Sequence, residues 1–393
     1  MWDEKRIGDF AKLITKGTTP TSVGCKFEDS GINYIKSESI GVGRRLDKSK
    51  YAFISEETHE KLKRSQIEEG DILFSMAGAY LGKTGIVTNT DVPANTNQAV
   101  AIIRLDTEKI NPRFVYYVLN QPSMVALVNS TSSQSAQPNI NLKDIGNLIF
   151  ECPDRATQDR IVNLLSNIDD IIENNEKINR NLSEQAQVIF VNRFVDATPE
   201  GEQKPLYDFA EYINGTSFKK DEYKAEGVPI IKIAELKNGI TGSTQYFTGE
   251  KDKKYDVKNG DILFSWSGNP DTSIDVFIWT HGHGILNQHT FNVKTNDDYK
   301  WFVFLMLKYF KSEFAAIASN KQTTGLGHVT VADLKRLTFV YAREEIESFE
   351  NEVTPIMNLI YNNMIENRKL ESLRDSLLPK LMSGELDVSD LDN

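Results

Sequence analysis

The sequence predicts an α+β protein in which two homologous globular domains are each followed by a long α-helix. The two helices are predicted to pair as an antiparallel coiled coil with pseudo-two-fold symmetry. Two observations lead to this fold class. The chain of 393 residues contains an internal repeat with a period near 190 residues, which is too long for a solenoid. A heptad pattern of apolar residues also follows each copy of the repeat.

The repeat is clearest in one short apolar segment. Residues 70–78 (GDILFSMAG) recur as residues 260–268 (GDILFSWSG), with seven of nine positions identical. Further matches follow in the same order, and they pair residues 9–11 with 208–210, 17–18 with 215–216, 35–36 with 231–232, 97–98 with 287–288, 141–145 with 330–334 and 171–182 with 359–370. Two homologous domains therefore follow one another in the chain.

The repeat and the heptads divide the chain into four segments. We predict a first globular domain over residues 1–153, a central helix over 154–196, a second globular domain over 197–342, and a distal helix with a C-terminal tail over 343–393. The net charge of −11 is unevenly distributed, because the globular segments carry 0 and −1 while the helical segments carry −3 and −7. A basic face on each globular domain is therefore compatible with an acidic chain.

Each globular half shows a mixed pattern of secondary structure. Short runs rich in β-branched and aromatic residues predict strands at 85–88, 99–105 and 274–279. Amphipathic stretches predict one helix over 111–127 and its counterpart over 300–318. We therefore expect a twisted sheet with a few helices in each half.

The two long helices each carry a seam of residues at alternating steps of four and three. The first seam contains Ile161, Leu165, Ile168, Ile172, Asn175, Asn179, Leu182, Ala186 and Ile189, and the second contains Phe349, Val353, Ile356, Ile360, Asn363, Asn367, Leu370, Arg374 and Leu377. The paired asparagines in both seams are expected to set the register, because a buried amide needs a hydrogen-bonding partner. Antiparallel pairing would place Asn175 opposite Asn367, and Asn179 opposite Asn363.

Two features fit this pairing less well. Arg374 would lie opposite Ile168, an apolar residue. Thr354 and Pro355 predict that the main part of the second helix restarts there, with Thr354 as its N-cap. The alternative arrangement is that each helix packs only on its own globular domain.

Composition excludes several classes of protein. Apolar residues make up 39% of the chain and charged residues 26%, as is typical of a folded globular protein. The apolar runs are too short to span a membrane, and the N-terminus lacks a signal-peptide pattern, so we expect a cytoplasmic protein. Cys25 and Cys152 suffice for neither a disulfide framework nor a zinc site.

The sequence shows no pattern of catalytic residues. A P-loop, a dinucleotide-binding fingerprint and a nucleophile elbow are all missing. Asn269 and Pro270 begin like the catalytic loop of amino-methyltransferases, but the second proline and the aromatic residue do not follow. His281, His283 and His289 have no neighbouring acid or thiol, so we expect no metal site. These absences favour a binding protein.

Several segments resemble the specificity subunit of type I DNA restriction–modification systems. Residues 7–20 (IGDFAKLITKGTTP) resemble the start of a recognition domain in that family, and the two GDILFS segments resemble its central strand. Residues 158–194 resemble the family's central conserved helix, and residues 373–386 (LRDSLLPKLMSGEL) are similar to its distal conserved region. The resemblance covers essentially the whole chain.

The resemblance implies a non-catalytic subunit with two target recognition domains, each reading one half of a bipartite, asymmetric site in double-stranded DNA. It also implies an antiparallel helical spacer with two methyltransferase subunits docked around it, which restriction subunits can join. This chain itself would bind no cofactor, because S-adenosylmethionine, ATP and Mg²⁺ would be bound by its partners. The methylated base would typically be an adenine that is flipped into the partner's pocket.

Candidate DNA-binding residues carry amides, hydroxyls, rings or positive charges that can reach base edges or phosphates. In the first domain they are Lys16, Thr18, Lys36, Ser37, Arg44, Arg45, Tyr80, Lys83, Asn97, Gln98, Ser133, Gln134 and Gln137. In the second they are Thr216, Lys219, Lys220, Lys232, Trp266, Asn269, His283, Asn287, Gln288, His289, Lys321, Gln322 and Thr323. The recurrence of Asn97–Gln98 as Asn287–Gln288 indicates a shared structural role more than the reading of a variable base.

Two other functions are left open by the sequence. One is a stand-alone DNA methyltransferase or nuclease, and the other is a coiled-coil scaffold whose globular parts bind proteins. The 28 steps from Ile161 to Ile189 correspond to about 42 Å of helix, which is on the order of one turn of duplex DNA. This length favours two DNA readers that are held at a set spacing.

Overall fold

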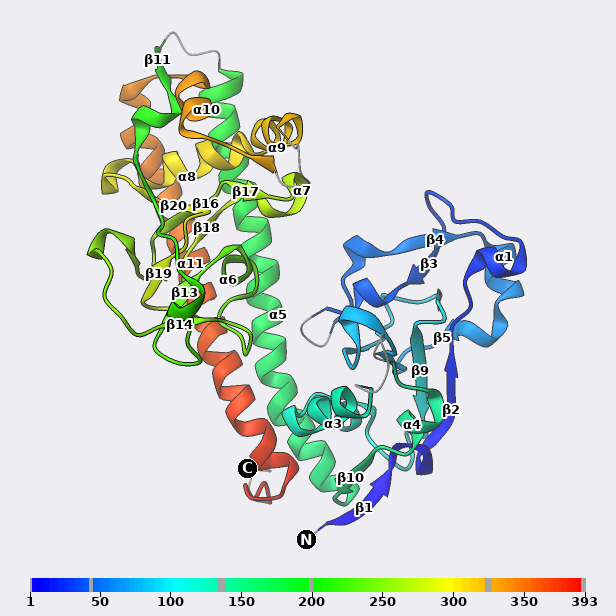
Figure 1. Ribbon diagram of the computed structural model, residues 1–393. Coiled ribbons are helices and arrows are strands. Elements are labelled where there is room, and N and C mark those ends of the chain that lie inside the picture. The colour runs from blue at the N-terminus through cyan, green and yellow to red at the C-terminus, as the bar shows by residue number, and fades with distance from the viewer. Residues whose placement is uncertain (1, 42–44, 133–138, 198–200, 322–326, 390–393) are drawn as a thin grey trace. The chain divides into compact units, whose positions relative to one another are not determined.

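The computed structural model describes residues 2–41, 45–132, 139–197, 201–321 and 327–389. The chain forms two compact units (Figure 1). Unit 1 contains Met1–Ile171 and Leu370–Asn393, and unit 2 contains Ile172–Lys369. The boundary between the units therefore falls inside both long helices.

Two four-stranded sheets form the globular part of unit 1. The first has the order β2 (Ala11–Lys16), β9 (Val100–Leu105), β6 (Ile72–Ser75) and β7 (Thr84–Ile86), and all neighbours are antiparallel. The second has the order β4 (Ala52–Ile54), β3 (Ile32–Ile35), β8 (Ala94–Thr96) and β5 (Gln66–Ile67), with β3 and β8 parallel. A separate antiparallel ladder joins β1 (Asp3–Arg6) to β10 (Ile149–Cys152).

Unit 2 repeats both sheets and the ladder of unit 1 and adds one further short ladder. Its first sheet has the order β12 (Glu211–Asn214), β20 (Thr290–Lys294), β16 (Ile262–Ser265) and β18 (Asp275–Ile278). Its second sheet has the order β14 (Tyr246–Phe247), β13 (Val228–Ile231), β19 (Gly284–Leu286) and β15 (Asp256–Val257). Two short ladders join β11 (Glu202–Pro205) to β22 (Thr338–Tyr341) and β17 (Ser267–Gly268) to β21 (Gly327–His328). The predicted duplication is confirmed, although each half contains two main sheets instead of one.

The repeated GDILFS segment forms the central strands β6 and β16. Ile72 and Phe74 are buried in one hydrophobic cluster, whereas Leu73 is buried in another. Successive side chains on a strand point to opposite faces, so this split shows that both faces of β6 are covered. Ile262, Leu263 and Phe264 are divided between two clusters in the same way. A strand buried on both faces needs a continuous apolar run, which explains why this segment is the most similar part of the repeat.

The acidic residue that precedes each central strand is neutralised by the neighbouring strand of the same sheet. Arg104 of β9 donates hydrogen bonds of 2.9 and 2.8 Å to the Asp71 carboxylate. At the matching positions, Lys294 Nζ of β20 lies 2.8 Å from Asp261 Oδ1. The two aspartates therefore stabilise the fold and add no uncompensated negative charge to either globular part.

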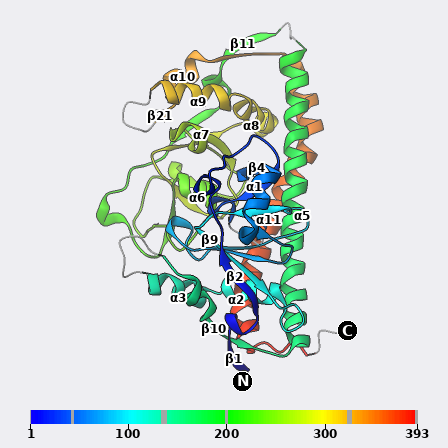
Figure 2. The ribbon, with the colours of Figure 1, turned by 90° about the vertical axis from the view of Figure 1, so that its right-hand side faces the viewer.

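The shorter helices cover the sheets within each unit. Unit 1 contains α1 (Glu56–Lys61), α2 (Pro112–Leu119), α3 (Pro122–Ser132) and α4 (Leu142–Gly146). Unit 2 contains α6 (Ile233–Asn238), α7 (Pro270–Ser273), α8 (Lys300–Tyr309), α9 (Lys311–Asn320) and α10 (Val331–Arg336). Figure 2 shows α8, α9 and α10 gathered near β11.

The expectation of one continuous helix over 111–127, and of another over 300–318, is wrong. The first stretch is divided between α2 and α3, and the second between α8 and α9. Pro122 starts α3, and a residue that precedes proline disfavours the helical conformation. In unit 2 the break falls at Phe310, whose side chain is buried in the core.

The two long helices are α5 (Arg155–Val191) and α11 (Arg343–Met382). The expectation that the second helix restarts at Thr354 is wrong, because α11 runs unbroken through Pro355. The Thr354 hydroxyl lies 3.4 Å from Glu350 Oε2 within the same helix and does not cap a new one. Val353 and Met357 on either side of the proline are buried in the core of unit 2, and this packing offsets the backbone hydrogen bond that proline removes.

Within unit 2, α5 and α11 run side by side in opposite directions (Figures 1 and 2). Asn175 Nδ2 donates a 2.9 Å hydrogen bond to Asn367 Oδ1, and Asn363 Nδ2 donates one of the same length to Asn179 Oδ1. The heptad alignment predicted both of these asparagine pairs. Asn175 also donates to Glu366 Oε2 at 2.7 Å, so neighbouring residues of the partner helix complete the network.

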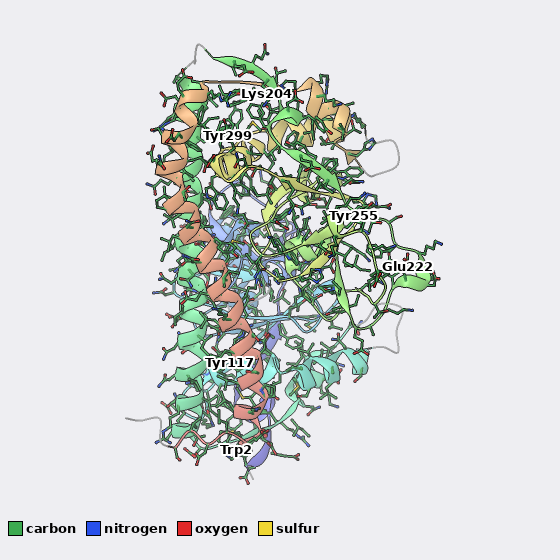
Figure 3. All side chains as sticks on the ribbon, turned by 90° about the vertical axis from the view of Figure 1, so that its left-hand side faces the viewer. Trp2, Tyr117, Lys204, Glu222, Tyr255 and Tyr299 are labelled. Atoms are coloured by element: carbon green, nitrogen blue, oxygen red, sulfur yellow. The ribbon has the colours of Figure 1, made fainter. Side chains whose placement is uncertain are left out.

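Arg374 is accommodated by an ion pair that the heptad pattern does not reveal. Its Nη1 atom lies 3.0 Å from Asp169 Oδ1 within unit 1, whereas the sequence placed it opposite Ile168. The Tyr117 hydroxyl donates a 2.6 Å hydrogen bond to the other oxygen of Asp169, and Figure 3 shows Tyr117 beside the helices. This network satisfies the buried carboxylate, so Arg374 is not a defect in the seam.

The ends of the two seams pack into globular cores. Ile161 and Leu165 of α5 belong to the main hydrophobic cluster of unit 1, together with Leu381 of α11. Phe349 of α11 belongs to the corresponding cluster of unit 2, together with Phe190 of α5. Each globular part therefore packs on one end of both helices, and the alternative in which each helix packs only on its own domain is wrong. The described helices do not include one that is both long and apolar enough to cross a membrane.

Candidate nucleic-acid interface

The ends of several strands meet at one edge of the unit 1 sheets. Lys16, at the end of β2, pairs with Ala101, and Ser75, at the end of β6, pairs with Val100. The end of β3 pairs in parallel with the end of β8. Residues 97–99 join β8 to β9, so they connect the edges of both sheets. The loops that follow β2, β3, β6 and β8 are therefore neighbours, and we call this region the recognition edge of unit 1.

Unit 2 forms a recognition edge with the same connections. Asn214, at the end of β12, pairs with Phe291, while Ser265, at the end of β16, pairs with Thr290. The end of β13 pairs in parallel with the end of β19. Residues 287–289 join β19 to β20 and occupy the place of residues 97–99.

A repeated glycine lets the backbone approach the turn at each recognition edge. A Cβ atom on Gly17 would lie 2.0 Å from the carbonyl oxygen of Thr96, and one on Gly215 would lie 2.2 Å from that of Asn287. The following residue then continues the contact, because the Thr18 amide donates a 2.9 Å hydrogen bond to Thr96. Only glycine permits this approach, which explains why the Gly–Thr pair recurs.

The repeated Asn–Gln pair has two different roles. The Asn97 side chain accepts a 3.0 Å hydrogen bond from the Ala99 amide and so stabilises the turn. Asn287 is buried at the matching position. Gln98 and Gln288 are exposed at the tips of the two turns. This geometry supports a structural role for the asparagines and leaves the two glutamine side chains at the surface.

The loops after the central strands differ in side chain but share their backbone contacts. The Met76 amide donates to Ala99 at 2.8 Å, and the Trp266 amide donates to His289 at 3.4 Å. Trp266 also donates from its ring nitrogen to Asn214 Oδ1 at 3.0 Å, and its ring centroid lies 5.6 Å from that of His289. A common backbone therefore presents methionine in unit 1 and an aromatic pair in unit 2.

Lysine side chains at both edges lie over aromatic rings. Lys36 Nζ is 5.1 Å from the centroid of Phe27, and Lys232 Nζ is 4.5 Å from that of Tyr223. Lys83 Nζ lies 5.0 Å from the centroid of Tyr80. The rings restrict these ammonium groups without neutralising their charge, as suits a contact with phosphate. Lys36 Nζ also lies 3.8 Å from Glu38 Oε1, so a phosphate would compete with this carboxylate.

Sequence reasoning missed several residues of the recognition edges. Arg64 Nη2 donates a 3.2 Å hydrogen bond to the Thr18 hydroxyl. The Thr19 hydroxyl donates to Gln98 Oε1, and Tyr34 donates to the Thr18 carbonyl at 3.1 Å. Burial raises the pKa of Tyr34 to about 12. The basic run at residues 61–64 indicated a possible basic face but did not single out Arg64, and no pattern indicated Thr19 or Tyr34.

Three candidates in unit 2 lie away from the recognition edge or have side chains that bind other groups of the protein. His283 precedes β19, at the opposite end of that strand from Gln288. Asn269 is the N-cap of α7 and accepts hydrogen bonds from the amides of the first turn. Lys321 forms an ion pair with Asp333. Burial would raise the pKa of Asp333, but hydrogen bonds from Lys321 and Thr330 outweigh burial and lower it to about 2.

The remaining candidates lie outside these contacts. Lys219 and Lys220 are exposed in the loop after β12; Figure 3 shows Glu222 of the same loop on the side of unit 2 away from the long helices. Ser37 follows Lys36 at the end of β3, and Arg45 is exposed before Leu46. The other candidates fall outside the described residues: Arg44, Ser133, Gln134, Gln137, Gln322 and Thr323.

The histidine-rich loop does not form a metal centre in the part of the chain that the structure describes. No group of three or more histidine, cysteine, aspartate and glutamate side chains has a suitable arrangement there. Burial lowers the pKa of His281 to about 4, with Arg368 as a further cause. His281 is therefore neutral at physiological pH and contributes no charge for binding phosphate.

Comparison with known proteins identifies the family. The model of the type I restriction–modification DNA specificity domain matches residues 1–184 and again residues 200–342. The chain belongs to this family. Two matches along one chain agree with the two recognition edges, and membership assigns a DNA-recognition role, which favours a non-catalytic subunit over the stand-alone methyltransferase or nuclease considered above.

Individual members of the type I specificity family are similar over most of their length. The MjaIX specificity subunit of Methanocaldococcus jannaschii is 24% identical, and the match covers 99% of this chain and 94% of the relative. The HindI specificity subunit of Haemophilus influenzae is 23% identical, with 82% of this chain and 88% of the relative covered. The solved S subunit from M. genitalium has the same fold, with 16% identity, a TM-score of 0.55, and coverage of 97% and 96%.

Proposed function

We propose that the chain reads a bipartite, asymmetric sequence in double-stranded DNA, with one half-site bound by each recognition edge. The observation that carries this proposal is one backbone arrangement that occurs twice with different side chains. Met76 in unit 1 corresponds to Trp266 in unit 2, and Ala99 corresponds to His289. Base edges are discriminated by the side chains that reach them, so two such edges would select two different half-sites.

The proposed partners are two methyltransferase subunits and, in a complete system, restriction subunits. The helical segments 154–196 and 343–393 carry most of the net negative charge and would repel phosphate, so they suit contacts with protein. The partners would bind S-adenosylmethionine, ATP and Mg²⁺ and would methylate a flipped adenine in the cytoplasm. This chain would contribute no catalytic residue and would bind no cofactor.

Candidate contacts can be assigned by their place at the recognition edges. Lys16, Lys36 and Lys83 would contact phosphates of the first half-site, and Gln98 would reach a base. In the second half-site Lys232 would contact phosphate, whereas Gln288, His289 and Trp266 would lie close to bases. The edges combine positive charge with exposed amides, as required for both positioning and reading.

The experiment is methylome sequencing of a host that expresses this chain with its methyltransferase. Gln98→Ala should relax or alter the methylated motif in one half only, and Gln288→Ala should alter only the other half. Loss of one good base contact should reduce discrimination about 10- to 100-fold at the affected position. Gln203→Ala, which changes an exposed glutamine on β11, serves as the matched control and should leave the motif unchanged.

The outcomes separate the proposal from its alternatives. A motif that changes in both halves with either glutamine variant would contradict the assignment of one half-site to each edge. Methylation that is independent of this chain would contradict its role in specificity altogether. Purified chain that methylates or cleaves DNA without a partner would instead support the stand-alone enzyme.

A further inference from the structure

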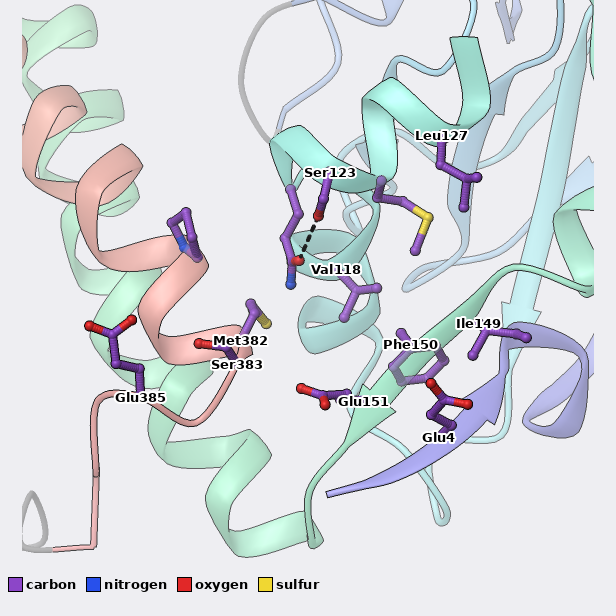
Figure 4. Close-up of a pocket in the computed structure, with 13 residues that line it drawn as sticks. Glu4, Val118, Ser123, Leu127, Ile149, Phe150, Glu151, Met382, Ser383 and Glu385 are labelled. Carbon is purple, nitrogen blue, oxygen red and sulfur yellow. Dashed lines mark hydrogen bonds between the residues drawn. The ribbon is translucent and has the colours of Figure 1, made fainter. Parts of the chain in front are cut away.

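A groove of 610 Å³ lies in unit 1 between the end of α11 and the ladder of β1 and β10 (Figure 4). Val118, Met124, Phe150 and Met382 form an apolar floor. Leu127 also lines the groove and remains 47% exposed. Large exposed apolar side chains beside a groove are typical of a binding surface.

Three carboxylates surround this apolar floor. Glu4 and Glu151 lie on the strand side in Figure 4, and Glu385 lies on the α11 side. Glu4 and Glu151 are directly opposite each other in the β1–β10 ladder, where like charges destabilise a strand pair. The described lining residues include no lysine or arginine, so the groove carries a net negative charge.

The matching positions of unit 2 lack the acidic character. The strand registers match Glu4 with Gln203, and Glu151 with Val340. The alignment of residues 171–182 with residues 359–370, continued toward the C-terminus, matches Ala197 with Glu385. No carboxylate of the groove is therefore repeated in the second copy.

The exposed apolar residue of the ladder is also not repeated. Ile149 is 48% exposed, and its counterpart is Thr338. Thr338 accepts a 2.7 Å hydrogen bond from Gln203, so this surface of unit 2 satisfies its own polar groups. The unit 1 ladder differs from that of unit 2 by its two opposed carboxylates and by the exposed side chain of Ile149.

We propose that the groove of unit 1 binds a basic, amphipathic segment of one methyltransferase subunit, so that two copies of that subunit bind this chain unequally. The inference rests on the proposed function, in which two identical partners use equivalent surfaces of the two copies. Lysine or arginine side chains of the segment would face the three carboxylates, and its apolar side chains would cover Leu127 and Ile149. The copy at unit 2 would meet a surface without these three carboxylates and bind more weakly.

The test measures the stepwise assembly of the purified full-length chain with its methyltransferase by native mass spectrometry over a range of ionic strength. The unaltered chain should form a 1:1 complex before a 2:1 complex, and the first step should weaken as salt is raised. The triple variant Glu4→Gln, Glu151→Gln, Glu385→Gln should weaken the first step about ten-fold and reduce its salt dependence.

A matched variant separates local from general charge effects. Glu56→Gln, Glu69→Gln and Glu108→Gln together make the same change in net charge at exposed positions of unit 1 that do not line the groove. This control should leave both steps unchanged. Equal effects of the two triple variants would overturn the role of the groove.

A photo-reactive benzophenone amino acid at Ser123, which lines the groove, provides a second readout that needs no loss of charge. It should cross-link to a lysine- or arginine-rich segment of the methyltransferase, and cross-linking to an acidic segment would overturn the inference. If the two binding steps are equally strong and the groove variants change neither of them, this inference is contradicted while the proposed function stands. A chain that binds no methyltransferase would contradict the proposed function as well.

Discussion

At the scale of single residues, the recognition edges depend on backbone positions more than on side chains. Gly17 and Gly215 permit the close contact with the turn, and the side chain of Asn97 stabilises the turn itself. These positions are shared between the copies, whereas Met76 and Trp266 differ. The same backbone arrangement therefore presents different side chains in the two units, as expected for two domains that read different sequences.

Gly215→Ala should destabilise unit 2 by about 1–3 kcal/mol, because the added methyl group must displace the backbone at Asn287. Thermal unfolding of the full chain would measure this loss. Gly242→Ala is the matched control, since a Cβ there meets no atom within 4 Å, and its stability should change little. Equal unfolding temperatures for the two variants would contradict the close approach.

At the scale of elements, the heptad pattern predicted which residues of α5 and α11 face each other. The asparagine pairs appear at the expected register, because the period of 3.5 residues is a local property that the sequence states directly. The pattern did not reveal the partner of Arg374. Asp169 lies next to a seam position, and Tyr117, which also binds Asp169, belongs to a different element.

Asn175→Leu alone should destabilise the helical pair by about 1–3 kcal/mol, because it removes the hydrogen bond that the buried Asn367 Oδ1 accepts. The double variant Asn175→Leu, Asn367→Leu should recover much of this loss, since both sites then become apolar. Chemical denaturation of the single and double variants in a mutant cycle provides the measurement. Additive effects would show that the two side chains do not interact.

At the scale of the whole molecule, the two helices pass from one compact unit to the other. Unit 1 contains the start of α5 and the end of α11, while unit 2 contains the remainder of both. If each unit reads a half-site, we expect the length of the paired helices to set the number of base pairs left unread.

Duplicating residues 173–179 and residues 361–367 together should lengthen both helices by about 10 Å, or roughly three base pairs. The insertion keeps the heptad phase and repeats the asparagine pairs. Methylome sequencing should therefore find the same two half-sites with a longer gap. The same insertion in one helix only should abolish methylation, because the two helices would lose their pairing register. An unchanged gap between the half-sites after insertion in both helices would contradict the proposal that helix length sets the gap.

Part of each recognition edge could be predicted from residue type and repetition. Lys36, Gln98 and Trp266 were selected because they can contact nucleic acid, and they do lie at the ends of neighbouring strands. His283 and Lys321 were selected by the same chemistry but have other positions or partners. Residue type does not show at which end of a strand a loop lies. Side-chain chemistry alone therefore could not distinguish residues at the recognition edges from residues elsewhere.

By itself, the sequence determined the duplication, the two long helices and the facing asparagines, because periodicity and self-similarity are properties of the chain alone. Only the tertiary structure decided that α11 continues through Pro355 and that each globular core takes one end of both helices. It also decided that three carboxylates of unit 1 line one groove, whereas the described residues at the matching positions of unit 2 are not acidic. These features depend on which distant residues pack together, and that choice follows from the free energy of burial over the whole molecule and not from any local pattern.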